Sequence, residues 1–430
     1  MKKNLLFLLA FLTMPLLTWA NINSQPTPGS YKLIVEGFDW GPAVSRLVLS
    51  MDQPIEEPRA SDFEIFVSRS SSQGEIPEAA RNGKRTVVTS YSSDSDGNRQ
   101  DDGKFLTLVL AVSPNNPIMS SMQYLRMGNR ASNVWIDYQV TVLHAKSGQV
   151  WNQSNGTLQQ DLKEFDLSGK FTHQNTTLTY GAFAPKNVTG KAPLIIWLHG
   201  GGEGGTDPSI ALLGNKAYNY ASPEIQVLFG GAYVLAPQTP TFWMDSGQGM
   251  TRGQVNDIYN AAVFALIQDY VAKNPGIDPN RIYVGGCSNG GYISLKLIFE
   301  HPDYFAAGYI SALAFNNEFV TDQMVQKIKN VPIWFVHSKD DMTTKPDETV
   351  VPLFDRLKKA GAKNVHFSYY DNVTDVTGLY GGEDFRYNGH WSWVYSHANT
   401  ARLDLDGKPV MVDGKPVTIM EWMAAQRKKK

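Results

Sequence analysis

One serine between two glycines, at the junction of a strand-like and a helix-like segment, constrains the fold of this chain more than any other feature. Residues 286–290 read Gly-Cys-Ser-Asn-Gly; an apolar β-type run over 281–285 precedes them and a helix-like run over 291–300 follows. Such a turn projects the hydroxyl of Ser288 clear of the sheet, and glycines at the flanking positions let strand and helix approach closely. Because the five-residue pattern arises by chance in about one chain in ten of this length, its place between strand and helix is what predicts a nucleophile elbow.

The elbow falls in a region where apolar strands alternate with amphipathic helices, which is typical of βαβ units and a mainly parallel sheet. This alternation of predicted strands and helices begins at about residue 161. A helix is predicted over about 253–272, with Val255, Ile258 and Val271 on its apolar face. The strands predicted for this region are 194–199, 233–237, 281–285, 307–311, 331–336 and 365–370.

Residues 21 to about 160 contain short alternating runs separated by turn residues, and their spacing predicts an all-β sandwich. The predicted strands are 31–35, 46–51, 62–67, 85–91, 105–112 and 134–143. A chain of 430 residues is long for one core. We therefore expect a β-sandwich domain over 21–160 and an α/β domain over 161–430. The stretch 94–98 has the glycine of a calcium loop in the wrong place, so a hairpin turn and no metal site is predicted there.

The first twenty residues predict a secretory signal peptide cleaved near Ala20, because two lysines precede a short apolar stretch over 5–17. The protein is therefore expected to be secreted or periplasmic. No cysteine lies at the end of the apolar stretch, so a lipid anchor is not expected there. Cys287 is the only cysteine in the chain, so an internal disulfide is not expected either. With 39 basic and 41 acidic side chains, the formal charge of −2 indicates no nucleic-acid partner and no membrane surface.

A serine hydroxyl is a poor nucleophile, so the elbow predicts a base and an acid elsewhere in the chain. The base predicted is His390, in a glycine-containing loop after the last predicted strand and after the acid in chain order. The acid is expected directly after the strand 331–336, where Asp341 is the first choice and Asp340 the alternative.

A glycine-rich run directly after the first predicted α/β strand, residues 198–205, predicts the donors for a developing oxyanion. The backbone N–H of Asn289 and that of Gly201, or of Gly202, are the expected pair, each worth about 3 kcal/mol of barrier. A nucleotide-phosphate loop is the competing interpretation, but the run lacks a Gly-Lys-Ser/Thr ending and dinucleotide spacing. His199 is expected to brace the loop.

Residues 161–430 resemble the α/β-hydrolase esterases grouped with polyhydroxybutyrate depolymerases, feruloyl esterases and prolyl-oligopeptidase-like hydrolases. Residues 31 to about 145, with the phrase 35–42, resemble the immunoglobulin-like domain that precedes some of these esterases. Two departures bear on the shape of the acyl pocket: Cys287 stands where a larger residue is commoner, and Asn289 replaces the more frequent methionine or glutamine. The phrases that carry the hydrolase resemblance, in order, are 198–205, Ala236-Pro237-Gln238, 278–283, 288–292 and Gly389-His390-Trp391-Ser392-Trp393.

This resemblance implies a secreted serine hydrolase that cleaves small-molecule or polymeric esters by two-step acyl transfer, without metal or organic cofactor. Ser288 would attack, His390 would take its proton and Asp341 would hold the imidazole. Cys287 is expected to be a buried packing thiol. The alternatives are a prolyl-oligopeptidase-type serine peptidase, a depolymerising feruloyl or acetyl esterase, and a non-catalytic binding protein. Three tryptophans are expected to wall the substrate cleft: Trp243, Trp391 and Trp393.

Overall fold

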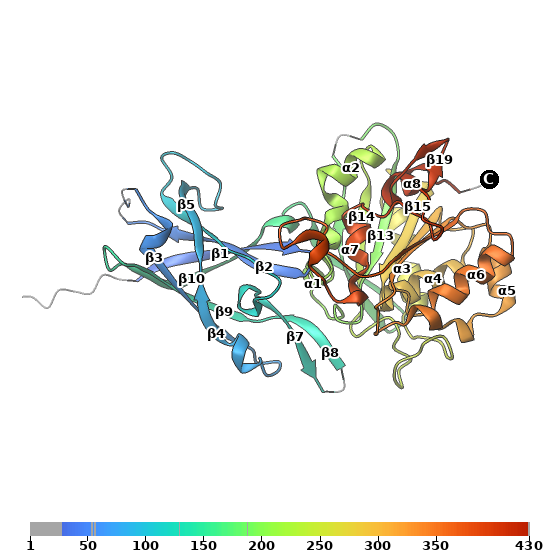
Figure 1. The fold of residues 1–430 in the computed structure, drawn as a ribbon, viewed down its shortest axis with the longest axis horizontal. Helices are drawn as coiled ribbons and strands as arrows, with labels where there is room; N and C mark the ends of the chain where they lie inside the picture. The colour runs from blue at the N-terminus through green and yellow to red at the C-terminus, as the bar shows by residue number, and fades with distance from the viewer. Residues whose placement is uncertain (1–27, 53–54, 56, 129, 187, 429–430) are drawn as a thin grey trace, which may run out of the picture.

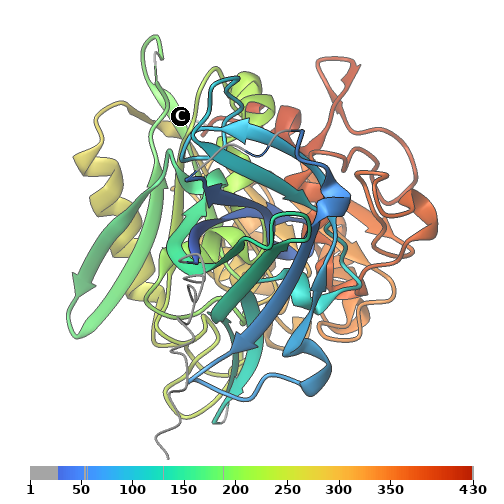
Figure 2. The ribbon, with the colours of Figure 1, turned by 90° about the vertical axis from the view of Figure 1, so that its left-hand side faces the viewer.

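The computed structural model describes residues 28–52, 55, 57–128, 130–186 and 188–428, so the predicted signal peptide lies outside the described residues. Figure 1 shows two bodies side by side along the long axis, a strand-rich one built from the N-terminal part and a mixed one built from the rest. The view along that axis in Figure 2 shows the N-terminal strands in front of the larger body. No helix in the described part of the chain is long and apolar enough to span a bilayer.

The N-terminal body contains one eight-stranded sheet in the order β4-β3-β9-β10-β1-β2-β6-β5, with β1 and β10 parallel and the other neighbours antiparallel. Alternation sets which face is buried: in β3, Phe63, Ile65 and Val67 point into the core while the residues between them are exposed. The strands are β1 (Gly29–Phe38), β2 (Gly41–Ser50), β3 (Phe63–Ser70), β4 (Asn82–Arg85), β5 (Val87–Ser93), β6 (Phe105–Leu110), β7 (Met122–Met127), β8 (Arg130–Trp135), β9 (Asp137–His144) and β10 (Val150–Gln159).

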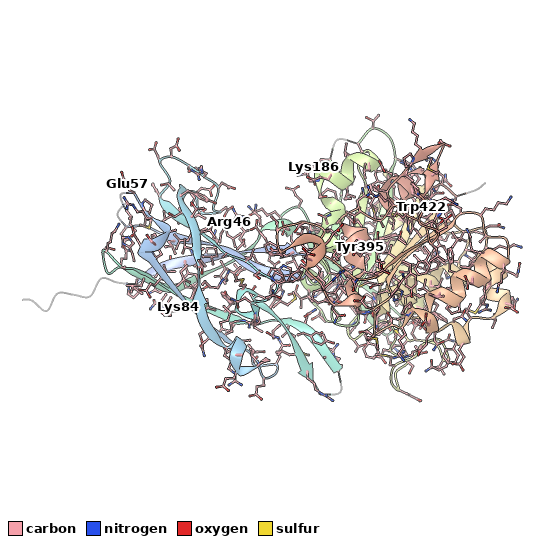
Figure 3. All side chains as sticks on the ribbon, viewed as in Figure 1. Arg46, Glu57, Lys84, Lys186, Tyr395 and Trp422 are labelled. Carbon is pink, nitrogen blue, oxygen red and sulfur yellow. The ribbon has the colours of Figure 1, made fainter. Side chains whose placement is uncertain are left out.

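This sheet curls around a single core. Arg85 on the edge strand β4 donates hydrogen bonds to the carbonyl of Val44 in β2 (2.8 Å) and to the hydroxyl of Tyr138 in β9 (2.7 Å), so distant members of the strand order meet. Lys84, the preceding residue, lies at the surface (Figure 3). Its Nζ pairs with Glu64. Burial of Arg85 is offset by these bonds, which is the usual condition for a charge inside a domain.

The strand predicted over 134–143 is two strands, which corrects the sequence-based expectation. β8 ends at Trp135 and pairs with β7 in a separate hairpin, whereas β9 begins at Asp137 in the main sheet. The N–H of Ile136 bonds the carbonyl of Ser121 (3.0 Å) where the chain changes from one sheet to the other. The alternation of apolar residues continues across this break, so periodicity alone does not reveal it.

The second body is built on an eight-stranded sheet in the order β11-β12-β14-β13-β15-β16-β17-β18. Its first two strands are antiparallel and the remaining six run parallel to one another. The sequence-based analysis did not include β11 and β12. The strands are β11 (Asp166–His173), β12 (Thr176–Phe183), β13 (Ala192–Leu198), β14 (Tyr233–Gln238), β15 (Ile277–Cys287), β16 (Ala307–Ser311), β17 (Ile333–Ser338) and β18 (Val365–Tyr370), with a small hairpin β19 (Met411–Val412) and β20 (Lys415–Pro416) near the C-terminus.

Helices cover both faces of this sheet, so its central strands are buried on both sides. In β15, Ile282 and Val284 belong to the core beneath α3 to α6, while Tyr283 and Cys287 belong to the core beneath α1, α2, α7 and α8. The helices are α1 (Pro208–Leu213), α2 (Pro223–Phe229), α3 (Asn260–Lys273), α4 (Asn289–Glu300), α5 (Asp322–Ile328), α6 (Val350–Lys359), α7 (Trp393–His397) and α8 (Ile419–Ala425).

The helix predicted from about residue 253 begins only at Asn260. Asp257 Oδ1 accepts hydrogen bonds from the N–H groups of Tyr259 (3.1 Å) and Asn260 (2.7 Å), which satisfies donors at the start of α3. Val255 and Ile258, predicted for the buried face, are 53% and 48% exposed in the preceding loop. The helix therefore begins later in the chain than the apolar spacing predicts.

Candidate active site

Ser288 lies on the sharp turn between β15 and α4, with a backbone conformation of φ 53° and ψ −114° that is unfavourable for a serine. A Cβ on Gly286 would stand 2.3 Å from the carbonyl oxygen of Leu198, and one on Gly290 would stand 1.7 Å from the same atom. Only glycine fits at these two positions. The turn thus has the geometry that the pentapeptide predicts, and the Ser288 side chain does not cap α4.

Two loops at the carboxyl ends of β17 and β18 bring Asp341 and His390 together. His390 Nδ1 lies 2.9 Å from Asp341 Oδ2, and the Asp341 side chain is fully buried. The other carboxylate oxygen, Oδ1, accepts the N–H groups of Thr343 (2.8 Å) and Thr344 (3.0 Å). Asp340, the alternative acid, is exposed and accepts a bond from the hydroxyl of Ser338.

A second histidine, His337 at the end of β17, contacts the same carboxylate. Its Nε2 lies 3.0 Å from Asp341 Oδ2 and 2.9 Å from the carbonyl oxygen of Thr344. A carbonyl only accepts, so Nε2 carries the proton and His337 is a donor to Asp341. Burial by itself would raise the pKa of Asp341, but the bonds from His337 and His390 outweigh it and hold that pKa well below the usual range. Sequence analysis missed His337; its only signal was its place four residues before Asp341.

Ser288 and His390 line the same cavity. Among the hydrogen bonds of the described residues, none joins the Ser288 hydroxyl to the His390 ring. The ring contacts Asp341 and Thr344 through Nδ1, and the backbone N–H of His390 donates to Asn388 Oδ1. Such contacts are often loose in a hydrolase without substrate and tighten in the complex.

His199 holds the first peptide unit of the loop 200–205, which carries the N–H of Gly201. His199 Nδ1 lies 2.6 Å from the carbonyl oxygen of Gly200, and His199 Nε2 accepts the N–H of Thr239 (3.2 Å), so the proton is on Nδ1. Burial lowers the pKa of His199 to about 4, which keeps the ring neutral at pH 7. In a trans peptide C=O and N–H point in opposite directions, so the N–H of Gly201 faces away from His199.

The N–H of Asn289 is the second expected donor, and it lies in the first turn of α4, where an N–H has no partner within the helix. A Cβ on Gly201 would meet the Asn289 side chain amide at 3.0 Å, so the two residues are neighbours. Within the described residues, neither N–H donates to another backbone group. Two free donors therefore lie beside Ser288.

Residues 30–158 match the family profile described as the esterase Ig-like N-terminal domain, and residues 243–324 match that of the prolyl oligopeptidase family. The chain also has the fold of a protein described as a thermostable esterase, with a TM-score of 0.71 and 23% identity over 93% of this chain and 99% of that one. The chain therefore has an α/β-hydrolase fold preceded by a domain that matches the esterase Ig-like profile. The predicted fold class and the predicted resemblance are thereby confirmed.

The chain is also similar to a curated protein described as "Probable carboxylesterase SOBER1-like" from Arabidopsis thaliana. The two are 27% identical over 168 residues, which are 35% of this chain and 60% of that protein. The chain thus spans about 60% of the length of that relative.

The cavity that holds Ser288 has a volume of about 910 Å³ and lies between the Ig-like domain and the hydrolase domain. Trp391 and Trp393 line it from the hydrolase domain, and Trp40 and Tyr124 line it from the Ig-like domain. A contribution of the Ig-like domain to this cavity was not predicted, because its lining residues are ordinary strand and turn residues of a distant segment.

Trp243 does not belong to this wall, so that prediction was wrong. Its side chain is fully buried, and its ring packs against those of His199 (5.1 Å between centroids) and Tyr259 (6.3 Å). It supports the residue that braces the loop 200–205. Cys287 is fully buried, as expected for a packing thiol, and burial raises its pKa well above the ordinary value.

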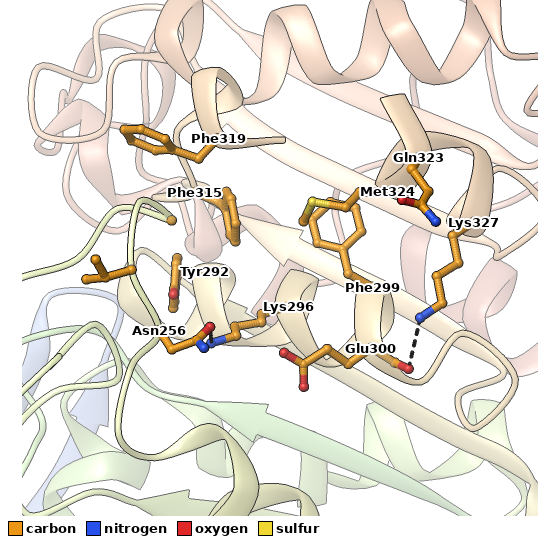
Figure 4. A pocket seen from close by; sticks show the side chains of 12 residues that line it. Asn256, Tyr292, Lys296, Phe299, Glu300, Phe315, Phe319, Gln323, Met324 and Lys327 are labelled. Carbon is orange, nitrogen blue, oxygen red and sulfur yellow. Dashed lines mark hydrogen bonds between the residues drawn. The ribbon is translucent and has the colours of Figure 1, made fainter. Parts of the chain in front are cut away.

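A smaller cavity of about 470 Å³ contains none of the predicted site residues (Figure 4). Aromatic side chains such as Phe299 and Phe315 form much of its wall. Its lysines are engaged: Lys296 Nζ pairs with Asp257 Oδ2 (2.6 Å), and Lys327 Nζ donates to the carbonyl of Glu300 (3.3 Å). The larger cavity is the candidate active site.

Proposed function

We propose that the chain is a secreted serine hydrolase that cleaves carboxylic esters, with Ser288 as nucleophile, His390 as base and Asp341 as the acid that orients it. The observation that carries the proposal is the pairing of His390 with Asp341 at 2.9 Å, in the cavity wall that also contains the strained turn of Ser288. The esterase descriptions of the matched profile and of the Arabidopsis relative support it.

In the first step the Ser288 oxygen attacks the ester carbonyl while His390 Nε2 takes the hydroxyl proton, and the same proton then leaves with the alcohol. Asp341 accepts a hydrogen bond from the Nδ1–H of His390 and stabilises the imidazolium. The N–H groups of Gly201 and Asn289 stabilise the negative oxygen of the tetrahedral intermediate. Water, deprotonated by His390, releases the acid from the acyl enzyme in the second step. No metal or organic cofactor takes part.

The size and lining of the cavity support bulky substrates. A volume of about 910 Å³ lies at the upper end of the range for small-molecule sites. Aromatic side chains from both domains, among them Trp40, Tyr124 and Trp391, offer flat apolar surface to an aryl acyl or alcohol group. We therefore propose aromatic esters, free or attached to a polymer, as the substrate class.

The test is hydrolysis of p-nitrophenyl and methyl hydroxycinnamate esters by the wild type and by Ser288→Ala. We expect turnover by the wild type, a burst of nitrophenol equal to the enzyme concentration, and a loss of at least about 10⁴-fold in kcat for the variant. A fluorophosphonate probe should label the wild type only. Full activity of Ser288→Ala, or an inert and unlabelled wild type, contradicts the proposal.

The match to the prolyl oligopeptidase family makes peptide hydrolysis the second candidate. The two functions differ in the leaving group, since an amine must be protonated as it departs and an activated phenol need not be. Peptidyl p-nitroanilides assayed beside the matched esters discriminate them. A kcat/KM for the anilide equal to that for the ester favours the peptidase.

Secretion is part of the proposal and rests on residues 1–20. Expression of the full chain in a bacterial host, followed by sequencing of the mature N-terminus from the periplasm or medium, tests it. We expect the mature protein to begin at Asn21, and an intact N-terminus in the cytoplasm would contradict export.

A further inference from the structure

The hairpin of β7 and β8 in the Ig-like domain contacts the loop 200–205 of the hydrolase domain. The N–H of Asn133 donates to the carbonyl oxygen of Gly202 at 2.7 Å. The hydroxyl of Ser132 lies 2.9 Å from that same oxygen and 3.1 Å from the carbonyl oxygen of Gly204, and donates its proton between them. Backbone carbonyls of the loop are thus held by donors from the other domain.

A side chain bond strengthens this contact. Asn133 Nδ2 donates to Glu203 Oε1 at 2.7 Å, and the Glu203 side chain is buried. From the hydrolase side, Gln238 Nε2 donates to the carbonyl of Glu203 (2.9 Å), and the N–H of Gly205 bonds the carbonyl of Thr239 (2.8 Å). The loop is therefore tied on two sides, one of which is the Ig-like domain.

Two peptide units, Gly202–Glu203 and Gly200–Gly201, connect these bonds to the N–H of Gly201, the proposed oxyanion donor. Because β8 holds the carbonyl of Gly202, the N–H of Glu203 in the same peptide unit points inward, where it bonds the carbonyl of Gly200 (3.4 Å). That carbonyl, which His199 also holds, belongs to the peptide unit whose N–H is that of Gly201. The orientation of the Gly201 N–H thus depends on β8.

We propose that Ser132 and Asn133 of the Ig-like domain are positioning residues for the acyl transfer, because they hold the loop 200–205 in the conformation that directs the N–H of Gly201 at the oxyanion. The inference rests on the proposed function, and it assigns the Ig-like domain a part in the chemical step. Their effect is on the transition state, where the oxygen becomes negative, and little on the bound ester.

Other contacts also join the two domains. The hydroxyl of Tyr218 donates to the carbonyl of Gly37 (2.7 Å), and Lys216 Nζ pairs with Asp39 (2.7 Å). Tyr218 therefore provides a matched control, since Tyr218→Phe and Ser132→Ala each remove one hydroxyl that donates to a backbone carbonyl across the same interface.

The experiment compares Ser132→Ala, Asn133→Ala and Tyr218→Phe in the full-length protein, after thermal unfolding has shown that each is folded. Deleting an oxyanion donor outright costs about 10²-fold or more in kcat. Misdirecting one should cost less, so we expect kcat to fall about tenfold in Ser132→Ala, with KM nearly unchanged. The loss should be smaller in Asn133→Ala, which removes the bond to Glu203 but keeps the backbone N–H that bonds Gly202. Tyr218→Phe should keep the wild-type kcat.

A second readout separates positioning from general destabilisation. Phenylboronic acid forms a tetrahedral adduct with an active serine and places an oxygen where the oxyanion forms, so its Ki should rise in parallel with the loss of kcat. Amide hydrogen exchange over 200–205 should be faster in Ser132→Ala and not in Tyr218→Phe. Equal kinetics and equal exchange in the two variants would overturn the inference. A wild type without turnover and without fluorophosphonate labelling would overturn the proposed function itself.

Discussion

The two halves of the candidate site are held in different ways. On the acid–base side, the partners of Asp341 within its own loop and strand, His337, Thr343 and Thr344, all come from one short segment of the hydrolase domain. On the oxyanion side, the loop 200–205 is bonded by Ser132 and Asn133, about seventy positions away and in another domain.

The forces differ as well. The acid–base side is a buried charge surrounded by donors, which makes it strong and sensitive to any change of charge. The oxyanion side consists of neutral backbone groups that are individually weak, so their direction depends on several bonds acting together. Charge substitutions should therefore disable the first side, and changes at the domain interface should weaken the second.

The largest effect is expected from Asp341→Asn. The amide leaves the size of the side chain unchanged but removes the charge that His390 needs, and we expect kcat to fall about 10⁴-fold, or about 5.5 kcal/mol. Asp340→Asn is the matched control and should change kcat less than about threefold, because Asp340 is exposed. Steady-state kinetics on one aryl ester measures both, and a larger loss for Asp340→Asn would reverse the assignment of the acid.

A smaller effect, on stability, is expected at Glu203 on the oxyanion side. Burial raises its pKa from 4.5 to about 7, against the lowering effect of the Asn133 bond; the Cys287 thiol and the Tyr124 hydroxyl also face it. The unfolded chain releases the proton near pH 4.5 and the folded one near 7, so the free energy of unfolding falls as pH rises between those values, by roughly 3 kcal/mol.

Glu203→Gln should remove this pH dependence of the free energy of unfolding, because glutamine does not titrate, and it keeps an acceptor for Asn133. Urea unfolding at pH 5 and at pH 8 measures it: the wild type should lose more stability than the variant over this interval. Glu78→Gln, on an exposed helical turn, should behave like the wild type. If the free energy of unfolding of Glu203→Gln and of the wild type changes equally between pH 5 and pH 8, the prediction is contradicted. Glu203 would then not titrate differently in the folded and unfolded chain.

The smallest effect is expected at His337. His337→Leu deletes one donor to Asp341 and should lower kcat about tenfold, since a hydrogen bond to a charged group contributes roughly 1.5–3 kcal/mol. His337→Gln keeps an N–H near the position of Nε2 and should recover part of the loss. If the two variants have the same kcat, His337 fills space and does not orient Asp341.

Local sequence predicted the turn at Ser288 and the loops on which the candidate site residues lie. Gly286 and Gly290 are required because a side chain at either position would collide with the backbone of Leu198. Both glycines lie within two residues of Ser288, so the pentapeptide was enough to predict the turn. The alternation of strands and helices predicted the sheet, because its parallel strands are buried on both faces. The apolar spacing does not reveal the hydrogen bonds of Asp257 ahead of α3 or the change of sheet at Ile136.

Residue type and spacing by themselves determined which side chains this protein has available for chemistry, and on which loops they lie. The packed chain alone decided which of them face the cavity: Trp243 is closed off in a core while Trp391 lines the wall, and Asp341 rather than Asp340 contacts His390. It alone decided that Ser132 and Asn133 meet the loop 200–205. The reason is physical, since a hydrogen bond between segments seventy residues apart depends on how two domains pack and imposes no pattern on either segment.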